Sequence, residues 1–470
     1  MNPAERSVLF FLSAFIVTSC AAPAVVDVAL VQFFVWGEKN PTSSTFAYPA
    51  FAQARGDLAS YKAVMNFSST VLSDPSITTC DQFDKTIAFW ATLLTDQDKA
   101  NSPVSAIFGP GCPTSAAAVA QVAATANIPM LIGIEGDAAL ANKKRFPTLT
   151  RMSPYMPEDL SRFVSTVLRN FKYDTVGILC DDANDTLAIY GPMCTKLFDS
   201  LRLRYNTSAS RFYVKSTDPQ NVKHYLEEMK FTTRVIIIIA HGDRIRPIML
   251  AASDSQMTGG DYVYFTFELY PDKKNFGSIT WNTGDADKRD ADARTAFSSL
   301  FVISLHNAST SPEYRNFSHV VKLNTRMFNL NFAYQRGEEI NPFAVSYYYA
   351  LTIYSQVLNQ LLKSGGNLHD GAALSKLMWN RTFTILGQDI VINANGDRDA
   401  DWTLSQIDSK TGIFQPVMEY SANRKTLEPA RNPVDKSVRK IVWFKRDTPP
   451  PNEPKCGYRG TKPGCGTAKG

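Results

Sequence analysis

The stretch SAIFGPGCPTSAAAVAQVAATANIPMLIGIEG, residues 105–136, decides the fold because it contains one complete strand–helix–strand unit. Its apolar run 105–108 stops at a Gly-Pro-Gly turn, which is typical of a buried strand. The Pro-Thr-Ser sequence at 113–115 then predicts the start of a helix of small residues that ends near residue 126. An Asn-Ile-Pro break and a second apolar run at 130–134 predict the next buried strand.

The turn within this unit is a candidate ligand site. Its backbone N–H groups lie at a helix N-terminus and at the carboxyl edge of a parallel strand, where open α/β sheets bind ligands. A tight turn that binds no ligand would have the same spacing, so both interpretations stay open. The glycine spacing matches neither a Walker loop nor a dinucleotide fingerprint, which excludes a nucleotide site. The candidate residues are Gly111, Cys112, Thr114 and Ser115.

Length and composition indicate a two-lobed soluble protein. The chain has 470 residues and a mass of 52.1 kDa, which is too large for one ordinary core. Hydrophobic residues make up 44% and charged residues 20%, as in globular proteins. The net charge of +5 is too small and too dispersed for a nucleic-acid-binding surface, so we expect no nucleic-acid partner.

The N-terminus is predicted to be a signal peptide, residues 1–21. Arg6 precedes the apolar run 8–17, and small residues follow at 18–22. That run is too short to cross a membrane, and no later stretch approaches about 18 uninterrupted apolar residues. The same region also resembles a bacterial lipoprotein processing site, in which Cys20 would be the lipidated residue.

The remaining six cysteines predict disulfides, because an even number in an exported chain is typical of cross-linking. Sequence cannot fix the connectivity, but proximity suggests Cys80–Cys112, Cys180–Cys194 and Cys456–Cys465. No CxxC pair occurs and histidines number five, so we expect no metal site. Sequons favour a eukaryotic secretory route; they occur at Asn66, Asn184, Asn206, Asn307, Asn316 and Asn380.

Alternation of apolar runs and helical patterns predicts two doubly wound parallel-sheet lobes. For the first lobe, strands are expected at 26–35 and 71–77 and helices at 48–65 and 81–94. For the second, strands are expected at 174–180, 234–240, 262–269 and 301–306, and helices at 158–171 and 244–255. We assign lobe I to 25–150 plus about 335–380, lobe II to 151–334 plus about 381–430, and a juxtamembrane-like tail to 431–470.

Three further segments have recognisable patterns. The polar excursion 271–298 begins a calcium-loop spacing, but Arg289 fills the third ligand position, which favours a solvated loop. A long helix over 344–362 is capped by Asn341. Residues 381–392 and 402–407 are expected to be paired strands. The proline-rich tail is interpreted as a tether.

No catalytic motif is present: the chain has no GxSxG, HExxH, Walker or kinase signature. His241 follows a buried strand, where catalytic residues do occur, but a structural or ligand-contact role is favoured. Asp181 and Asp182 also follow a strand, and helix capping is favoured for them. We therefore predict no catalytic residue, although a site assembled from distant residues leaves no local motif.

Several motifs resemble a known family. GPGC at 109–112, followed by a helix and IPMLI at 128–132, is similar to the ligand-binding region of natriuretic-peptide receptors and receptor guanylyl cyclases. RMSP at 151–154, NPFA at 341–344 and NGDR at 395–398 show the same resemblance.

The tail is the most specific part of this resemblance. IVWF at 441–444 and PPPNEPKCG at 449–457 are similar to the segment just outside the membrane in receptor guanylyl cyclases, above all in their large nematode set. The resemblance covers about residues 25–466. The chain stops at Gly470, before any membrane span or cyclase, so we expect an excised ectodomain, a truncated gene model or a secreted relative without cyclase activity.

The resemblance implies a type I periplasmic-binding-protein fold, with two lobes joined by three crossing strands and a cleft between them. It also implies dimers whose rearrangement is relayed across one membrane helix. In the family, cysteines at the positions of Cys80 and Cys112 are bridged. In natriuretic-peptide receptors, N–H groups matching Gly111 and Cys112, with an upstream serine, hold a chloride. Ser73 is the corresponding serine, although its neighbours differ.

Our hypothesis is an extracellular sensor in which an unknown small molecule or peptide contacts both lobes and selects one geometry. Besides the turn residues, the candidates for ligand contact follow strands; they are Glu135, Tyr155, Asp181, Asp182, His241 and Glu268. The alternatives are a bacterial solute-binding lipoprotein of the same fold, a secreted enzyme that uses the cleft, and a decoy ectodomain that captures a peptide.

Overall fold

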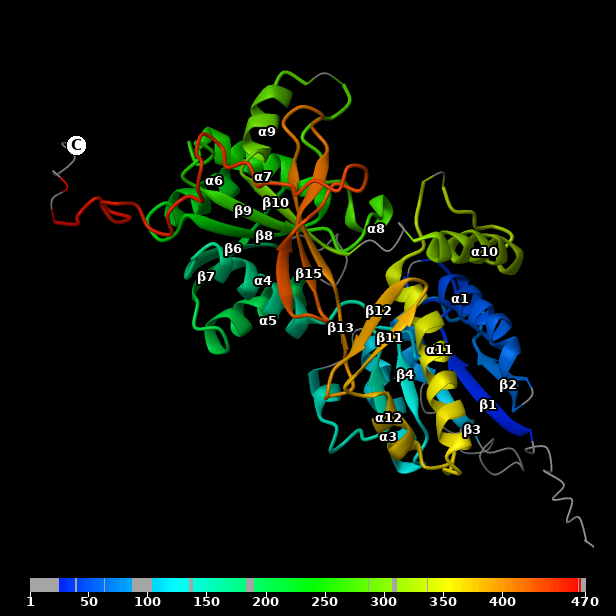
Figure 1. Cartoon of the computed structure of the whole chain (residues 1–470). Coiled ribbons are helices and arrows are strands. Elements are labelled where there is room, and N and C mark those ends of the chain that lie inside the picture. The colour runs from blue at the N-terminus through cyan, green and yellow to red at the C-terminus, as the bar shows by residue number, and fades with distance from the viewer. Residues whose placement is uncertain are drawn as a thin grey trace, which may run out of the picture.

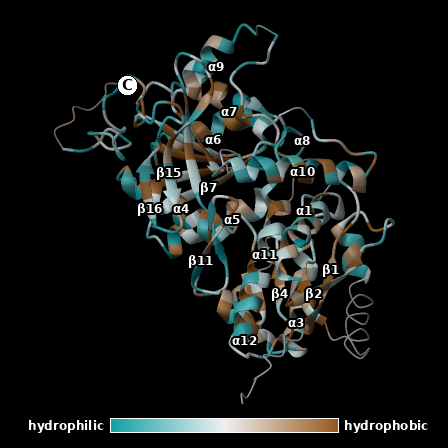
Figure 2. Ribbon diagram, turned by 45° about the vertical axis from the view of Figure 1, so that its right-hand side comes forward, coloured by the Kyte–Doolittle hydropathy of each residue, from teal (hydrophilic) through white to brown (hydrophobic). Residues whose placement is uncertain are grey.

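The computed structural model describes residues 25–38, 40–62, 64–86, 104–134, 138–182, 190–285, 287–306, 311–335, 337–463 and 465. Two lobes lie beside each other, and chain segments cross between them (Figure 1). Figure 2 shows hydrophobic residues concentrated along the strands of both lobes, as expected for sheets that are covered on both faces. The expected two-lobed α/β architecture is confirmed.

Lobe I contains a parallel sheet in the order β2-β1-β3-β4-β5. Its strands are β1 (Val26–Phe33), β2 (Met65–Leu72), β3 (Val104–Phe108), β4 (Met130–Ile132) and β5 (Leu149–Arg151). Alternate side chains of a strand face opposite layers: Leu30 packs with α1 (Ser44–Asp57) and α11 (Pro342–Lys363), whereas Val31 packs with α3 (Pro113–Thr125). This alternation makes the sheet doubly wound.

Lobe II contains a larger sheet in the order β16-β15-β14-β10-β9-β8-β6-β7. Its parallel part comprises β6 (Thr175–Asp181), β7 (Ser208–Val214), β8 (Val235–Ile239), β9 (Val263–Phe267) and β10 (Leu300–Leu305). The antiparallel part comprises β14 (Trp402–Ile407), β15 (Phe414–Ser421) and β16 (Thr426–Pro429).

Helices cover both faces of the lobe II sheet. One face packs against α4 (Pro157–Asn170) and α5 (Tyr190–Leu203), and the other against α6 (Pro219–Met229), α7 (Gly242–Asp254) and α9 (Asp290–Phe297). Other helical elements of the described residues are a segment over 80–86, η1 (Leu58–Tyr61), η2 (Ala138–Ala141), α8 (Lys273–Phe276), α10 (Pro312–Phe328) and α12 (Gly371–Met378). Asn341 caps α11 as expected, because its side chain accepts a 2.8 Å hydrogen bond from the N–H of Ala344.

The expected pairing of 381–392 with 402–407 is wrong. β11 (Arg381–Ile385) pairs with β12 (Gln388–Ile392) around a two-residue turn, and β12 pairs with β13 (Arg398–Asp399). Leu386 and Gly387 both have positive φ, which suits such a tight hairpin. The strand at 402–407 instead pairs with β10 and β15 of lobe II.

The lobe boundaries also differ from the sequence assignment. The aromatic side chains of Tyr314 and Phe317 place α10 in the hydrophobic cluster of α1 and α11, and Phe383 and Ile390 place the β11–β12 hairpin there too. Lobe I therefore gains 312–328 and 381–399, which the sequence assigned to lobe II. The chain passes from one lobe to the other around 152–156, between the end of β10 and the start of α10, and around 399–402.

One helix and one strand of lobe I begin earlier than the sequence predicts. The helix expected at 48–65 is α1, which ends at Asp57, and the strand after it is β2, which begins at Met65 and not near residue 71. In the excursion 271–298, two carboxylates are bound by Arg246, so this segment is ordered around an ion-pair network and contains α9. The helix expected at 81–94 is present over 80–86, and its remainder lies outside the described residues, as does the signal peptide.

The tail is docked on lobe II, so its interpretation as a simple tether is wrong. The Trp443 ring packs 5.2 Å from Phe171 and 5.5 Å from Phe301. The Asn452 side chain accepts hydrogen bonds from the N–H groups of Asp174 and Thr175, where β6 begins. The tail thus contacts the amino end of the lobe II sheet. Within the described part of the chain, no helix is both long and apolar enough to cross a bilayer.

Candidate functional site

A cavity of about 340 Å³ lies where the two lobes meet. Lobe II supplies the carboxyl ends of β9 and β10, lobe I supplies α10 and the first turns of α11, and the 398–401 crossing segment runs along it. The polar and aromatic residues of the cavity wall include Glu268, Tyr270, His306, Glu339, Tyr349, Asp389, Arg398 and Asp401. A cavity with walls from both lobes changes shape when the lobes move relative to each other.

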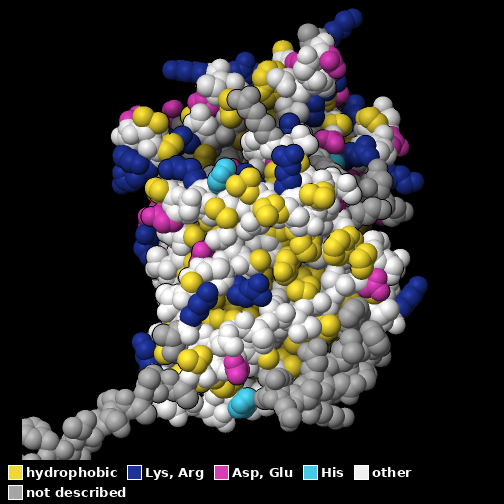
Figure 3. Space-filling view, turned by 90° about the vertical axis from the view of Figure 1, so that its right-hand side faces the viewer, with side chains coloured by type: hydrophobic (Ala, Val, Ile, Leu, Met, Phe, Trp, Pro, Cys, Tyr) yellow, Lys and Arg dark blue, Asp and Glu magenta, His cyan; other side chains and the backbone are white. Residues whose placement is uncertain are grey.

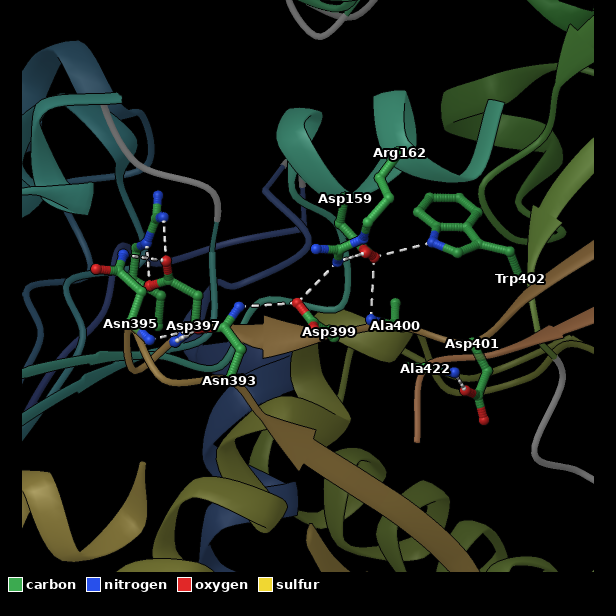
Figure 4. Close-up of polar contacts among 11 residues, drawn as sticks. Asp159, Arg162, Asn393, Asn395, Asp397, Asp399, Ala400, Asp401, Trp402 and Ala422 are labelled. Carbon is green, nitrogen blue, oxygen red and sulfur yellow. Dashed lines mark hydrogen bonds and ion pairs between the residues drawn. The ribbon is translucent and has the colours of Figure 1, made fainter. Parts of the chain in front are cut away.

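In the crossing segment from Asn393 to Trp402, Asp397 and Asp399 make separate sets of polar contacts (Figure 4). Asp397 accepts two 2.6 Å hydrogen bonds from Arg151, at the end of β5. Lys143 Nζ lies 3.2 Å from the same carboxylate. Burial alone would raise the pKa of Asp397, but Arg151 and Lys143 hold it below its usual value.

The next aspartate connects this segment to lobe II. Asp399 Oδ1 accepts hydrogen bonds from Asn393 Nδ2 at 2.8 Å and from Arg162 of α4 at 2.9 Å. In the same α4, the buried carboxylate of Asp159 contacts Arg162 and accepts a 2.9 Å bond from the indole N–H of Trp402 (Figure 4). Burial raises the pKa of Asp159 despite Arg162. The crossing segment is therefore held at one end by β5 and at the other by α4.

Arg398, in the same segment, lines the cavity. Its guanidinium lies 5.2 Å from the centre of the Tyr349 ring, and its Nε has no hydrogen-bond partner in the described structure. Burial lowers the pKa of Arg398, partly offset by the nearby Tyr349 and Asp401. An arginine has so high a reference pKa that the group stays charged.

The sequence analysis predicts a ligand site at the carboxyl edge of the lobe I sheet. Most polar groups at this edge form hydrogen bonds with other residues of the chain. The hydroxyl groups of Thr114 and Ser115 both donate to the carboxylate of Asp84. The carbonyl oxygen of Gly111 accepts hydrogen bonds from Asn40 and from Thr42, the latter at 2.6 Å. A Cβ at Gly111 would lie 2.6 Å from the Thr42 carbonyl oxygen, so glycine is needed there for close packing.

The other lobe I candidates are placed as follows. Cys112 is buried and bonded to Cys80. Ser73 follows β2, and its Oγ is buried without a hydrogen-bond partner in the described structure. Glu135 lies outside the described residues. Tyr155 is fully buried in the lobe II hydrophobic cluster and does not line the cavity, so burial in the core overrides its predicted cleft position.

The candidates from lobe II lie at the carboxyl edge of its sheet. Glu268, after β9, lines the cavity, and burial raises the pKa of its carboxyl group. Asp181 ends β6, and its Oδ1 accepts a 3.3 Å bond from the N–H of Ser216. Asp182 is exposed. His241 precedes α7, and its Nδ1 lies 3.6 Å from an oxygen of Asp243.

Sequence reasoning missed the residues that lobe I and the crossing segment bring to the cavity. Arg398 and Asp401 belong to a DRDADW sequence, whose alternating charges are typical of an extended segment with polar side chains on both sides. This pattern could have indicated both residues from the sequence. Tyr349, in α11, is almost fully buried. Nothing in its helix indicates that its ring also borders a cavity, since this depends on where lobe II lies.

The described residues contain three disulfides, Cys80–Cys112, Cys180–Cys194 and Cys456–Cys465, the pairings that proximity in sequence suggests. Among the sequons, Asn66, Asn206, Asn316 and Asn380 are exposed, and Asn184 and Asn307 lie outside the described residues. Asn66 lies within β2, but this is an edge strand and the side chain points to solvent.

Comparison with known proteins gives a consistent result. Residues 47–409 match the family described as Receptor family ligand binding region. Atrial natriuretic peptide receptor 3 of Rattus norvegicus is 30% identical over 319 residues, 67% of this chain and 57% of the relative. Atrial natriuretic peptide receptor 2 of Homo sapiens is 26% identical over 376 residues, 76% of this chain and 34% of the relative. The chain therefore spans between one third and three fifths of the length of these relatives. With a family match over most of its length and a cavity between two doubly wound lobes, this chain belongs to the family of receptor ligand-binding regions.

Proposed function

We propose that this chain is the extracellular sensor of a single-pass receptor guanylyl cyclase and that it binds its ligand without catalysis. The observation that carries the proposal is the cavity shared by both lobes and a crossing segment. A ligand that contacts both walls stabilises one arrangement of the two lobes. The signal then depends on how much more tightly the ligand binds this arrangement than the alternative one. The matched relatives are natriuretic peptide receptors, so a peptide is one ligand class to test beside small molecules.

The docked tail supports a route for the signal. Trp443 and Asn452 attach the tail to lobe II, at the end of the sheet opposite the cavity. A change in the orientation of lobe II would therefore move the tail as well. In a receptor in which a membrane span follows the tail, this movement would reach the membrane.

A second copy of the chain is the proposed partner. Hydrophobic side chains gather on the face of the molecule shown in Figure 3. On and just after α10, Leu323, Met327 and Leu330 have exposed fractions of 52%, 77% and 85%. Exposed apolar residues in one region are typical of an interaction surface, and a two-fold dimer would cover the same surface on both copies. Sedimentation equilibrium should show a dimer that Met327→Lys weakens, whereas Leu203→Lys, at an exposed site on α5, should not.

The sensor function can be tested in a chimera. Residues 25–465 would replace the ligand-binding region of a receptor guanylyl cyclase, and cyclic GMP would be measured in cells exposed to fractionated biological extracts. An active fraction should raise cyclic GMP. Ile279→Trp, which enlarges a partly exposed side chain in the cavity wall, should abolish this response while surface expression is kept.

Leu203→Trp is the matched control, because Leu203 is 83% exposed on lobe II and away from the cavity. It should respond as the unmodified chimera does. An extract response that survives Ile279→Trp would contradict binding in the cavity. Consumption of the active compound by the purified chain would contradict binding without catalysis and favour the secreted enzyme.

We also propose chloride as a bound ion at the start of α3. The donors would be the N–H groups of Gly111 and Cys112, which precede the helix and have no partner inside it, and Ser73 Oγ, which is buried and unpartnered in the described structure. The chain should unfold at a higher temperature in sodium chloride than in sodium gluconate of equal ionic strength. Ser73→Ala should reduce that difference, and an equal difference in the variant would contradict the site.

Export through the secretory pathway is the proposed localisation. Three disulfides suit an oxidising compartment, and every described sequon is exposed to solvent. Mass spectrometry of the mature N-terminus should find cleavage near residue 21 and glycans on Asn206 or Asn380. A lipid on Cys20 would instead identify the bacterial lipoprotein of the same fold.

A further inference from the structure

The carboxyl edge of the lobe II sheet contains polar atoms that the described structure leaves without partners. They are Oδ2 of Asp181, the hydroxyl of Tyr190 and Oγ of Ser216. Tyr190 and Ser216 are buried, with exposed fractions of 5% and 2%. Buried polar groups normally have a hydrogen-bond partner, and a buried polar group without one destabilises the folded chain. Three such atoms at one sheet edge indicate a place where a ligand completes the bonding.

Tyr190, the first residue of α5, has its hydroxyl group among acidic side chains. Burial raises the pKa of the phenol, and the carboxylates of Glu268, Asp181 and Asp243 raise it further. Asp243 is already engaged, because its Oδ1 accepts a 2.8 Å bond from the N–H of Ser278. Asp181 and Glu268 follow β6 and β9, which are separated by β8 in the sheet. Their backbones are therefore about 10 Å apart, and both carboxylates lie close enough to Tyr190 to raise the pKa of its phenol.

The charges on the crossing segment already compensate one another. Asp399 is paired with Arg162 at 2.9 Å. Asp401 lies near Arg398, and their opposite charges attract. Glu268 differs, because burial raises the pKa of its carboxyl group and no cation of the described chain offsets that effect.

The acids of the lobe I wall are also accounted for. Glu339 lies 3.9 Å from Nζ of Lys322. Asp389 is exposed and accepts a 2.9 Å bond from the side chain of Asn423. Among these acids, Asp389 is exposed to solvent, whereas Glu268 of lobe II is largely buried and has no cation of the described chain beside it.

The geometry points to a ligand with a positive charge. We propose that the lobe II edge binds the ammonium group of a small organic cation, with Glu268 and Asp181 as counter-ions and the Tyr190 oxygen as a further acceptor. Nearby, the Tyr270 ring lines the cavity and adds an aromatic face that favours a cation. A metal ion is less suited, because the described residues contain no group of three or more His, Cys, Asp or Glu arranged to hold one. This inference rests on the proposed ligand-binding function and specifies the charge of the ligand.

The experiment uses the purified full ectodomain, residues 25–470, and simple probes. Methylamine, putrescine and choline, as chloride salts, would be titrated against sodium chloride of equal ionic strength, with the thermal midpoint and calorimetric binding as readouts. At least one amine should raise the midpoint in a saturable way. Glu268→Gln should weaken that binding by about tenfold or more, and Tyr190→Phe by a smaller factor.

Asp199→Asn is the matched control, because it removes one exposed carboxylate from α5, the helix that contains Tyr190. It should bind the amine as the unmodified chain does. Equal weakening in Asp199→Asn and Glu268→Gln would show general charge screening and overturn the inference. Stabilisation by calcium or magnesium ions in place of the amines would also overturn it.

The same panel separates this inference from the proposed function. It would include acetate and glucose, and small-angle scattering would report whether the lobes close. Closure by acetate or glucose, with no effect of the amines, would overturn the cationic ligand and leave a ligand-binding cleft. In contrast, if the chimera with Ile279→Trp still responds to the extract, the ligand does not bind in the cavity. That result would contradict the proposed function independently of the amine titrations.

Discussion

The carboxyl edges of the two parallel sheets are built from the same kind of strand–turn–helix unit, yet their polar groups are satisfied differently. In lobe I, Thr114 and Ser115 donate to Asp84, and Arg151 at the end of β5 is paired with Asp397. In lobe II, the Tyr190 hydroxyl and one oxygen of Asp181 have no partner in the described structure. The fold offers a ligand edge in both lobes, but in lobe I residues of the chain itself occupy most of it, and Ser73 Oγ is a buried polar atom that stays without a partner there in the described structure.

This difference has an energetic meaning. Internal partners stabilise lobe I and make its edge a fixed platform for the crossing segment. Unpartnered buried groups in lobe II lower the stability of the ligand-free chain, and a ligand that satisfies them would recover that free energy on binding. Substitutions should therefore destabilise at the lobe I edge and be tolerated, or even stabilise, at the lobe II edge.

The largest effect is expected from Asp397→Asn. It leaves Arg151 buried and Lys143 nearby without their counter-charge, and breaking a buried ion pair in this way costs about 3–5 kcal/mol. Urea unfolding at pH 7 would measure the loss, with Asp199→Asn as an exposed control. A loss as small as that of the control would mean that the lobe I edge is not held by this network.

The same substitution has a defined pH dependence. Because Arg151 and Lys143 hold the pKa of Asp397 below its unfolded value, its contribution to stability is present above about pH 4 and is lost as pH falls through the folded pKa. The difference in unfolding free energy between the original chain and Asp397→Asn should shrink in acid. A difference that grows in acid would contradict this assignment.

The second largest effect is expected from opening the disulfide of the lobe I edge. Cys80 and Cys112 are 32 residues apart, so the double serine variant should lose about 3–4 kcal/mol through the freedom it restores to the unfolded chain. The control is the double serine variant of Cys456 and Cys465, which opens a separation of only nine residues and should cost less. A larger fall of the calorimetric midpoint in the Cys456 and Cys465 variant than in the Cys80 and Cys112 variant would contradict this prediction.

A smaller effect is expected from Asp84→Ala. It removes the acceptor for two hydroxyl groups at the start of α3, in a role similar to that of a helix cap, and should cost about 1 kcal/mol. Asp81→Ala removes an exposed carboxylate from the same helical segment and should have little effect. Equal chemical-denaturation midpoints for the two variants would mean that the α3 terminus is not satisfied through Asp84.

The smallest effect, and one of opposite sign, is expected from Glu268→Gln. Burial raises the pKa of Glu268, so its contribution to stability is present in acid and is lost as pH rises through the folded pKa. At pH 7 the glutamine variant should therefore be more stable, by about 0.5–1 kcal/mol, and this gain should disappear near pH 4. A loss of stability at pH 7 would mean that Glu268 has a stabilising partner and that the two edges are alike.

Much of the architecture could be predicted because buried parallel strands are recognisable in isolation. The run at 235–239 is apolar throughout, since both faces of its sheet are covered, and the sequence pattern alone predicted that strand. The placement of α10 could not be predicted. Its apolar stripe indicates only that it packs on something, and the decision between lobe I and lobe II came from aromatic contacts with α1 and α11.

The residues of the candidate site also fall into those that the sequence predicted and those that it did not. Glu268 and Asp181 were predicted because they directly follow strands, and the carboxyl ends of parallel strands share an edge. Arg398 and Tyr349 were missed as site residues because their function depends on the position of the other lobe, which no local pattern contains. Tyr155 is fully buried in the lobe II hydrophobic cluster, which its position in the sequence does not reveal.

The amino-acid sequence by itself determined the two α/β lobes and the family resemblance, because these depend on residue types at short range, and it suggested the cysteine pairs without fixing them. Only the tertiary structure decided which sheet edge is closed by its own chain, where the tail docks and which side chains face each other across the cavity. These outcomes depend on contacts between residues that are far apart in sequence, as in the pairing of Arg151 with Asp397. The free energy of such contacts is set by geometry that the folded chain alone provides.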